Sequence, residues 1–222
     1  MLQDIAAFET ARSMMVDSQV RPNKVNDPRI VAAMRRIARE RFVPASCVAL
    51  AYADEDVPLG HGRFLLEPMA IGRLIQAAGV RPGERALVVA SGTGYGAAVL
   101  AACGAAVTAL EEDAGLLARA RAALASEAPE VALVSGPIAA GWSAGAPYDL
   151  ILIEGGVEVL PEAIAGQVQA PPGRLVMVRA GAGRVGHAVL GQRSGASLVF
   201  HEIFDCATAP LPQFRRAAAF VF

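Results

Sequence analysis

Lysine, paired cysteine and clustered histidine are scarce in this chain of 222 residues, and each shortage excludes a class of protein. Lys24 is the only lysine, and Lys plus Arg (20) nearly matches Asp plus Glu (21), so there is no basic block of the kind that binds nucleic acid. The three histidines show no metal-ligand spacing, and no metal is expected. The three cysteines are widely spaced without a CxxC pair, which indicates free thiols in a reducing compartment: Cys47, Cys103 and Cys206.

Signals for export or membrane insertion are also missing. The chain starts without the basic residues and apolar run of a signal peptide. Residues 86–110 carry no charge and meet the length test for a membrane span, but a turn cluster, Ser91-Gly92-Thr93-Gly94, interrupts their first half. A buried strand, a turn, a helix and a second strand explain this stretch better. We therefore predict a cytoplasmic protein without a membrane span.

Residues 1–80 show mainly helical patterns. Asp27-Pro28 is an N-cap followed by proline, and apolar residues then recur at helical spacing until Phe42-Val43-Pro44 ends the element. A less regular helix is expected near residues 5–16, and loop with short extended pieces over 51–66. A further helix is predicted over 67–78, with Gly79 closing it.

From residue 81 short apolar strands alternate with helices. Strands are expected at 86–90, 106–110, 131–134, 150–153 and 175–178, and helices near 96–103, 114–126 and 161–169. Three last strands, 185–190, 198–204 and 217–222, have no helices between them and predict an antiparallel edge. The pattern predicts one domain over 1–222. Its fold class is α/β and Rossmann-like, a mostly parallel central sheet with helices on both faces and an N-terminal helical cap.

The strand at 86–90 runs straight into the glycine loop Ser91-Gly92-Thr93-Gly94-Tyr95-Gly96. Glycine permits a tight turn and close approach of a ligand, and the following helix offers free N–H groups. Glu111 ends the next strand about 20 residues later, the spacing at which an acid meets ribose hydroxyls. No Gly-Lys-Ser/Thr follows, so this is not a Walker A loop. The alternative is a plain α/β turn, with Glu111 a solvated strand end.

Several further motifs follow one another along the chain. The N-terminal part contains Arg41-Phe42-Val43-Pro44, Ala51-Tyr52 and Pro58-Leu59-Gly60-His61-Gly62. The C-terminal part contains the glycine loop with Ala97-Ala98-Val99-Leu100-Ala101, then Gly141-Trp142, Pro147-Tyr148-Asp149-Leu150-Ile151 and Pro172-Gly173-Arg174-Leu175-Val176. In order and spacing this set resembles the protein-L-isoaspartate O-methyltransferase family, class I methyltransferases that repair proteins by carboxyl methylation.

The resemblance implies S-adenosylmethionine as cofactor, and a peptide or protein acceptor that carries a carboxylate. A carboxylate is already nucleophilic, so in-line transfer needs alignment and exclusion of water rather than a metal or a base. Residues 1–80 then form the cap and acceptor side, and 81–222 the cofactor-binding sheet. The implied acceptor-side residues are Gly60, Gly62, Arg63, Leu66 and Glu67. The implied cofactor-binding residues are Ala90, Ser91, Gly92, Gly94, Tyr95, Glu111, Gly136, Pro137 and Ile138.

The acceptor side departs from the family. The family reads Gln-Thr-Ile-Ser-Gln-Pro where this chain has Arg63-Phe64-Leu65-Leu66-Glu67-Pro68. Leu66 therefore stands where the family has the serine that acts on the acceptor carboxylate, and leucine cannot donate a hydrogen bond. The catalytic residue is unknown. Arg63 could pair with a carboxylate in bidentate fashion; equally, it could be a surface arginine or one paired to Glu67.

The cofactor side departs as well. Val88 aligns with a family acid, Ala90 with the first loop glycine, and Pro137 with the aspartate for the adenine amino group. Alanine at position 90 is the mildest change, provided its backbone does not need a positive φ. Glu154 follows the fourth strand at the ligand-binding edge, where it could replace a missing acid or be a solvated strand end.

Three functions remain open at this point. The first is an S-adenosylmethionine-dependent O-methyltransferase of isoaspartyl type, or one with another acceptor. The second is a non-catalytic binding protein with a decayed site, which Leu66, Val88 and Pro137 favour. The third is an NAD-dependent oxidoreductase, favoured only by the Rossmann-like pattern. A homodimer could form through the N-terminal helix or the edge of the C-terminal sheet.

Overall fold

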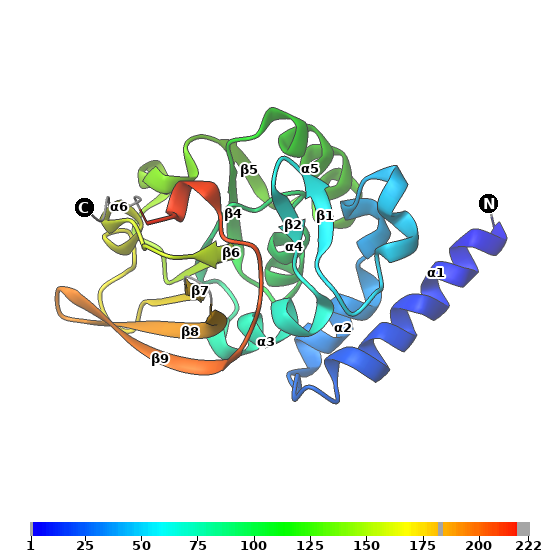
Figure 1. Ribbon diagram of the computed structural model, residues 1–222, viewed down its shortest axis with the longest axis horizontal. Helices are drawn as coiled ribbons and strands as arrows, with labels where there is room; N and C mark the ends of the chain where they lie inside the picture. The colour runs from blue at the N-terminus through cyan, green and yellow to red at the C-terminus, as the bar shows by residue number, and fades with distance from the viewer. Residues whose placement is uncertain (1, 182–183, 217–222) are drawn as a thin grey trace.

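The computed structural model describes residues 2–181 and 184–216 (Figure 1). The strand expected at 217–222 lies outside these residues. A seven-stranded sheet in the order β5-β4-β3-β6-β7-β8-β9 forms the centre. β1 (Val57–Gly60) and β2 (Arg63–Leu65) form a separate two-stranded sheet. No helix within the described residues is long and apolar enough to cross a membrane.

The strands of the central sheet follow the predicted apolar runs. Its parallel part is ordered by the pairings of β3 with β4 and β6, of β4 with β5, and of β6 with β7. The last two strands pair antiparallel, which confirms the first two of the three strands predicted for the C-terminal edge. The bounds are β3 Arg85–Val89, β4 Ala106–Glu111, β5 Ala132–Ser135, β6 Leu150–Val157, β7 Arg174–Gly181, β8 Arg184–Ser194 and β9 Ser197–Asp205.

The N-terminal region is helical, and the helix that starts at Asp27 forms as predicted. Asp27 caps it, because its side chain accepts a hydrogen bond from the N–H of Arg29. The helix ends at Arg36, however, and not at Phe42-Val43-Pro44. The bounds here are α1 Leu2–Met15, the π-helical η1 Val16–Val20, α2 Pro28–Arg36, and the 3₁₀ segments η2 Arg39–Phe42 and η3 Ala45–Leu50.

The two faces of the sheet are covered unequally. One face packs against α3 (Pro68–Ala78), α4 (Tyr95–Ala102) and α5 (Ala114–Glu127) in a core that continues into the N-terminal helices. The other face is covered by α6 (Glu162–Ala165) and by irregular segments. The continuous core favours the single domain that the sequence predicts. Three more 3₁₀ segments complete the chain: η4 Ile138–Ala140, η5 Ser143–Gly145 and η6 Pro212–Phe214.

The helix predicted over 161–169 is much shorter than expected. Gly166 ends it, and glycine is a poor helix former. The side chain of Gln167 then bonds the backbone of Trp142 and Ala140, and Val168 forms a bridge with Tyr148. Long-range contacts of Gln167 and Val168 therefore replace the helical hydrogen bonds that the periodicity predicted for them.

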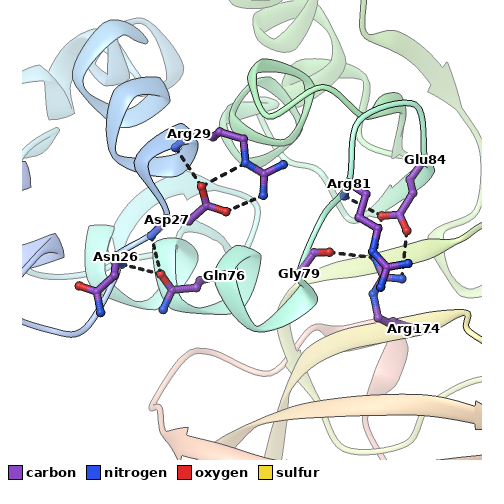
Figure 2. Close-up of polar contacts among 8 residues, drawn as sticks. All are labelled: Asn26, Asp27, Arg29, Gln76, Gly79, Arg81, Glu84 and Arg174. Atoms are coloured by element: carbon purple, nitrogen blue, oxygen red, sulfur yellow. Dashed lines mark hydrogen bonds and ion pairs between the residues drawn. The ribbon is translucent and has the colours of Figure 1, made fainter.

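Polar contacts join the carboxyl-terminal end of α3 to its neighbours (Figure 2). Gln76 accepts hydrogen bonds from the N–H groups of Asn26 and Asp27, at 2.5 and 3.0 Å, which fixes the start of α2. Gly79 ends α3 in the left-handed conformation, as predicted. Just beyond it, Arg174 at the start of β7 pairs with Glu84 at 2.6 Å. These contacts hold the helical cap against the sheet.

Candidate cofactor and acceptor site

The glycine loop lies at the carboxyl ends of the parallel strands, where ligands bind in open α/β sheets. Every residue from 90 to 96 is buried. Gly92 (φ +55°) and Gly94 (φ +94°) need the left-handed backbone that glycine adopts without strain. A Cβ at Gly92 would lie 3.1 Å from Leu59, and one at Gly94 3.0 Å from Leu124, so side chains would not fit easily.

Ala90 also has a positive φ, of +58°. The condition under which this alanine would be a mild change is therefore not met. An L-residue other than glycine pays roughly 1–2 kcal/mol in this conformation. The fold holds Ala90 there because Ser91 bonds the carbonyl oxygen of Leu110, and the Ala90 carbonyl oxygen accepts from Arg63 at 2.5 Å.

Glu111 is fully buried at the end of β4, so it is not a solvated strand end. Its carboxylate accepts four hydrogen bonds: from the Arg63 guanidinium at 3.0 Å, and from the N–H groups of Gly92 (2.8 Å), Glu112 (2.9 Å) and Asp113 (3.1 Å). A second Arg63 nitrogen lies 3.0 Å from its other oxygen. A carboxylate has about four acceptor sites. Ribose hydroxyls could thus bind Glu111 only after one of these donors leaves.

Arg63 reaches Glu111 from the β1–β2 hairpin, formed by β1 (Val57–Gly60) and β2 (Arg63–Leu65), which lies over the loop. Its side chain is 6% exposed. Arg63 is therefore neither a surface arginine nor the partner of Glu67, and both of these expectations are wrong. The hairpin turn contains Gly60 (φ +94°) and Gly62 (φ +71°), both exposed. Turn geometry accounts for these two glycines, and the ion pair of Arg63 accounts for the position of the hairpin.

Glu154 is buried as well, so its reading as a solvated strand end is wrong. β6 continues beyond the last residue paired with β3, which places Glu154 beside the loop. Its carboxylate lies against Gly96, where a Cβ would come within 2.2 Å of Oε1. Burial raises the pKa of Glu154 to about 8, while Arg63 and Arg39 lower it and Glu111 raises it further.

Buried polar atoms without a partner gather around this loop. Five occur in the described part of the chain, and four of them belong to Arg39, Ser91, Tyr95 and Glu154. Arg39 lies over the Tyr95 ring, 4.8 Å from its centroid, and Ser91 and Tyr95 belong to the loop itself. Because buried polar groups are rarely left unpaired, a ligand with its own donors and acceptors fits here. Arg39 and Tyr95 lie against each other, so Ser91 and Glu154 are the two groups left for a ligand. The glycine loop with these two groups fits S-adenosylmethionine, which carries an ammonium, a carboxylate and two hydroxyls.

Tyr95 itself points away from the loop edge. Its ring is fully buried and packs edge-on against Phe42, at 5.4 Å between centroids. Burial raises the pKa of its phenol. The ring therefore joins α4 to the N-terminal cap, and a cofactor would meet Tyr95 through its backbone.

The predicted adenine side lies after β5. The N–H of Gly136 bonds the Glu111 carbonyl oxygen at 3.2 Å, and Pro137 has no N–H to offer. The N–H of Ile138 donates to Glu112 at 3.0 Å. Glu112 thus joins β4 to the Gly136–Ile138 segment. Sequence reasoning missed it, although an acid directly after Glu111 was a visible signal.

The acceptor side differs more from expectation. Leu66 is 1% exposed in the hydrophobic core, and its carbonyl oxygen accepts from Arg39 at 2.6 Å. Glu67 is half-buried and lines a cavity of about 430 Å³ together with three further acids, Phe64 and residues 207–209; the acids are Asp54, Glu55 and Asp56. Burial and the nearby Asp56 raise the pKa of Glu67. The cavity is thus strongly acidic.

Arg39 is the second residue that the sequence did not single out. It is fully buried, and its guanidinium donates to the carbonyl oxygens of Ala51 (2.7 Å) and Leu66. These bonds explain why α2 stops before it: Ile37 is extended, which turns the chain so that Arg39 can enter the core. A lone arginine in a helical pattern gives no sign of such burial.

Comparison with known proteins gives one consistent result. Residues 10–211 match the model of the family described as protein-L-isoaspartate(D-aspartate) O-methyltransferase. A protein-L-isoaspartate O-methyltransferase of Methylorubrum populi is 43% identical over 76% of this chain and 79% of its own length. One of Koribacter versatilis is 32% identical over 94% of this chain and 93% of its own length.

Solved structures agree on the fold. A Plasmodium falciparum structure, described as a putative protein-L-isoaspartate O-methyltransferase in complex with S-adenosyl-L-homocysteine, has a TM-score of 0.78 at 16% identity. It covers 91% of this chain and 98% of its own. The predicted Rossmann-like methyltransferase fold is thereby confirmed. This chain belongs to the protein-L-isoaspartate O-methyltransferase family of S-adenosylmethionine-dependent methyltransferases.

Proposed function

We propose that this chain methylates the side-chain carboxylate of isoaspartyl residues in proteins or peptides, with S-adenosylmethionine as methyl donor. The observation that carries the proposal is the buried glycine loop at the carboxyl edge of the sheet, in a chain whose residues 10–211 match the family. The unpaired polar atoms beside the loop support a ligand at this place.

The cofactor supplies a methyl group on a positively charged sulfur. A carboxylate oxygen forms the new C–O bond as the S–CH₃ bond breaks, which gives a methyl ester and S-adenosylhomocysteine without any proton transfer. The protein contributes alignment of the two reactants and exclusion of water. The buried loop and the hairpin over it provide that enclosure.

Arg63 and Glu111 have paired roles in this proposal. In the ion pair, Arg63 bonds the Glu111 oxygens that would otherwise accept hydrogen bonds from ribose hydroxyls. When the pair opens, Glu111 can accept from the ribose, and Arg63 is free to hold the acceptor carboxylate. The remaining cofactor contacts come from residues 90–95 and 136–138.

The experiment has two steps. S-adenosylmethionine, S-adenosylhomocysteine and NAD are titrated by calorimetry, and labelled methyl transfer to an isoaspartyl peptide is then measured. We expect both adenosyl compounds to bind and the peptide to be labelled, whereas the matching aspartyl peptide is not. No heat from either adenosyl compound at millimolar concentration would overturn the proposal.

A second candidate is methyl transfer to a different acceptor. Leu66 replaces the family serine and is buried, and four acids line the cavity beside it, so the acceptor side repels an anion. Binding of S-adenosylmethionine without labelling of the isoaspartyl peptide would favour this candidate, or a binding protein without catalysis. Heat from NAD alone would favour the oxidoreductase.

Two sequence-based expectations stay predictions. One is a cytoplasmic location. The other is a homodimer through the N-terminal helix or the edge strand β9, which sedimentation velocity would test.

A further inference from the structure

We propose that Glu154 binds the α-ammonium group of S-adenosylmethionine. The inference rests on the proposed function, since it assigns a residue to the same cofactor site. It makes Glu154 a specificity-determining contact for the amino-acid part of the cofactor.

Glu154 lies in β6, next to the glycine loop. In β6, Glu154 follows Ile153, which pairs with Val89 at the end of β3. β3 leads directly into the glycine loop, so the carboxylate lies at the loop edge. Side chains alternate along a strand, and Glu154 faces the side of Leu152, towards α3 and α4. There it lies against Gly96, where an added Cβ would come within 2.2 Å of Oε1.

The Glu154 carboxyl group is buried and one of its oxygens lacks a partner. Glu154 is 5% exposed, Oε1 has no hydrogen-bond partner, and no ion pair to Glu154 forms within residues 2–181 and 184–216. A buried carboxyl oxygen without a hydrogen-bond partner is unfavourable, whether the group is neutral or ionised. A group that serves only the fold would have a partner, as Glu111 does. The unpaired oxygen at a ligand-binding edge therefore indicates a ligand that brings a donor, ideally a cation.

The chemistry of the cofactor supplies that cation. Its amino-acid part carries an ammonium with three N–H donors. The apolar side chain of Val88 offers no acceptor, and it lies in the core. Glu154 and Val88 belong to adjacent strands, β6 and β3, which pair in parallel. Val88 pairs with Leu152, and Glu154 follows two residues later on the same face, so its carboxylate lies where β3 runs into the loop.

The test compares two ligands that differ in the amino-acid part, which carries the ammonium. S-adenosylhomocysteine has the amino-acid part, whereas 5′-methylthioadenosine lacks it. Calorimetric titration of wild type and Glu154→Gln with each ligand isolates the contact. We expect the variant to bind S-adenosylhomocysteine about 10- to 100-fold more weakly, which is the size of a charge-assisted hydrogen bond. Its affinity for 5′-methylthioadenosine should change by less than about twofold.

The control variant is Glu162→Gln, which removes the same charge from an exposed position. It should bind both ligands as wild type does. A thermal unfolding scan checks that both variants are folded; Glu154→Met, close in length, is the second variant should Glu154→Gln not fold. Equal loss for both ligands, or no loss for either, would overturn the assignment of Glu154. No binding of S-adenosylhomocysteine to wild type would instead overturn the proposed function.

A proton measurement gives an independent readout. The charged groups that act on Glu154 are Arg63 from β2, Arg39 from η2 and Glu111 from β4. With its pKa raised to about 8, Glu154 is mostly protonated at pH 7 and must ionise to bind an ammonium. Titration in buffers of different ionisation enthalpy should show wild type releasing close to one proton more than Glu154→Gln. Equal proton release by the two would contradict the proposal.

Discussion

Two buried carboxylates at the same edge of the sheet have opposite surroundings. Glu111, at the end of β4, accepts four hydrogen bonds and pairs with Arg63. Glu154, in β6, has an oxygen without any partner. Burial penalises both carboxylates, but only Glu111 is compensated by protein groups. The difference separates two roles. Glu111, which holds the structure together, has its partners within the protein, whereas Glu154, where we propose that a ligand binds, has an unpaired oxygen.

The largest effect is expected from breaking the paired carboxylate. Glu111→Gln leaves the Arg63 guanidinium buried without its counter-charge, so the free energy of unfolding should fall by about 3–5 kcal/mol. Urea denaturation followed by circular dichroism measures this. Glu154→Gln is the matched variant at the other carboxylate and should lose far less. If the two variants lose the same stability, the contrast between the sites is wrong.

The next prediction concerns pH. Because the pKa of Glu154 is raised to about 8 from an ordinary value of 4.5, the folded state keeps this proton where the unfolded chain has lost it. The contribution of Glu154 to stability is therefore fully present below about pH 4.5 and is lost as pH rises towards 8, on the order of a few kcal/mol. Urea midpoints of wild type should fall relative to those of Glu154→Gln across this window. Parallel curves for the two proteins would contradict it.

A third prediction adds a side chain to the loop at Gly92. Gly92→Val places a branched residue at φ +55° and 3.1 Å from Leu59, which should lower the free energy of unfolding by about 1–3 kcal/mol and abolish binding of S-adenosylhomocysteine. Gly79→Val is the control, since it has φ +58° with no atom within 4 Å of the added Cβ. It should lose stability but keep binding. Normal affinity in Gly92→Val would mean that the cofactor site is misplaced.

The smallest effect is expected at Ala90. Ala90→Gly relieves the positive φ of +58°, so the free energy of unfolding should rise by about 1 kcal/mol, less the greater flexibility of glycine in the unfolded chain. Thermal unfolding measures the change. A lower melting temperature would show that the Ala90 methyl group contributes packing that outweighs the backbone strain.

Much of the fold could be read from local patterns. The apolar runs predicted the strands β3 to β7, because buried parallel strands are apolar on both faces, although β6 and β7 continue to Val157 and Gly181, beyond the predicted ends. Asp27 with Pro28, and Gly79, marked a helix start and a helix end through their own backbone chemistry. The helix at 161–169 failed because long-range contacts of Gln167 and Val168 replaced its second half.

The candidate site was only partly predictable. The sequence by itself determined the loop, its glycines and the family, because a tight turn and ordered motifs are local properties. Only the tertiary structure decided that Arg63 pairs with Glu111 across 48 residues, that Ala90 is strained, and that Glu154 is buried without a partner. The physical reason is that pKa, pairing and burial depend on which segments pack together, and charge alone does not fix the partner of a side chain.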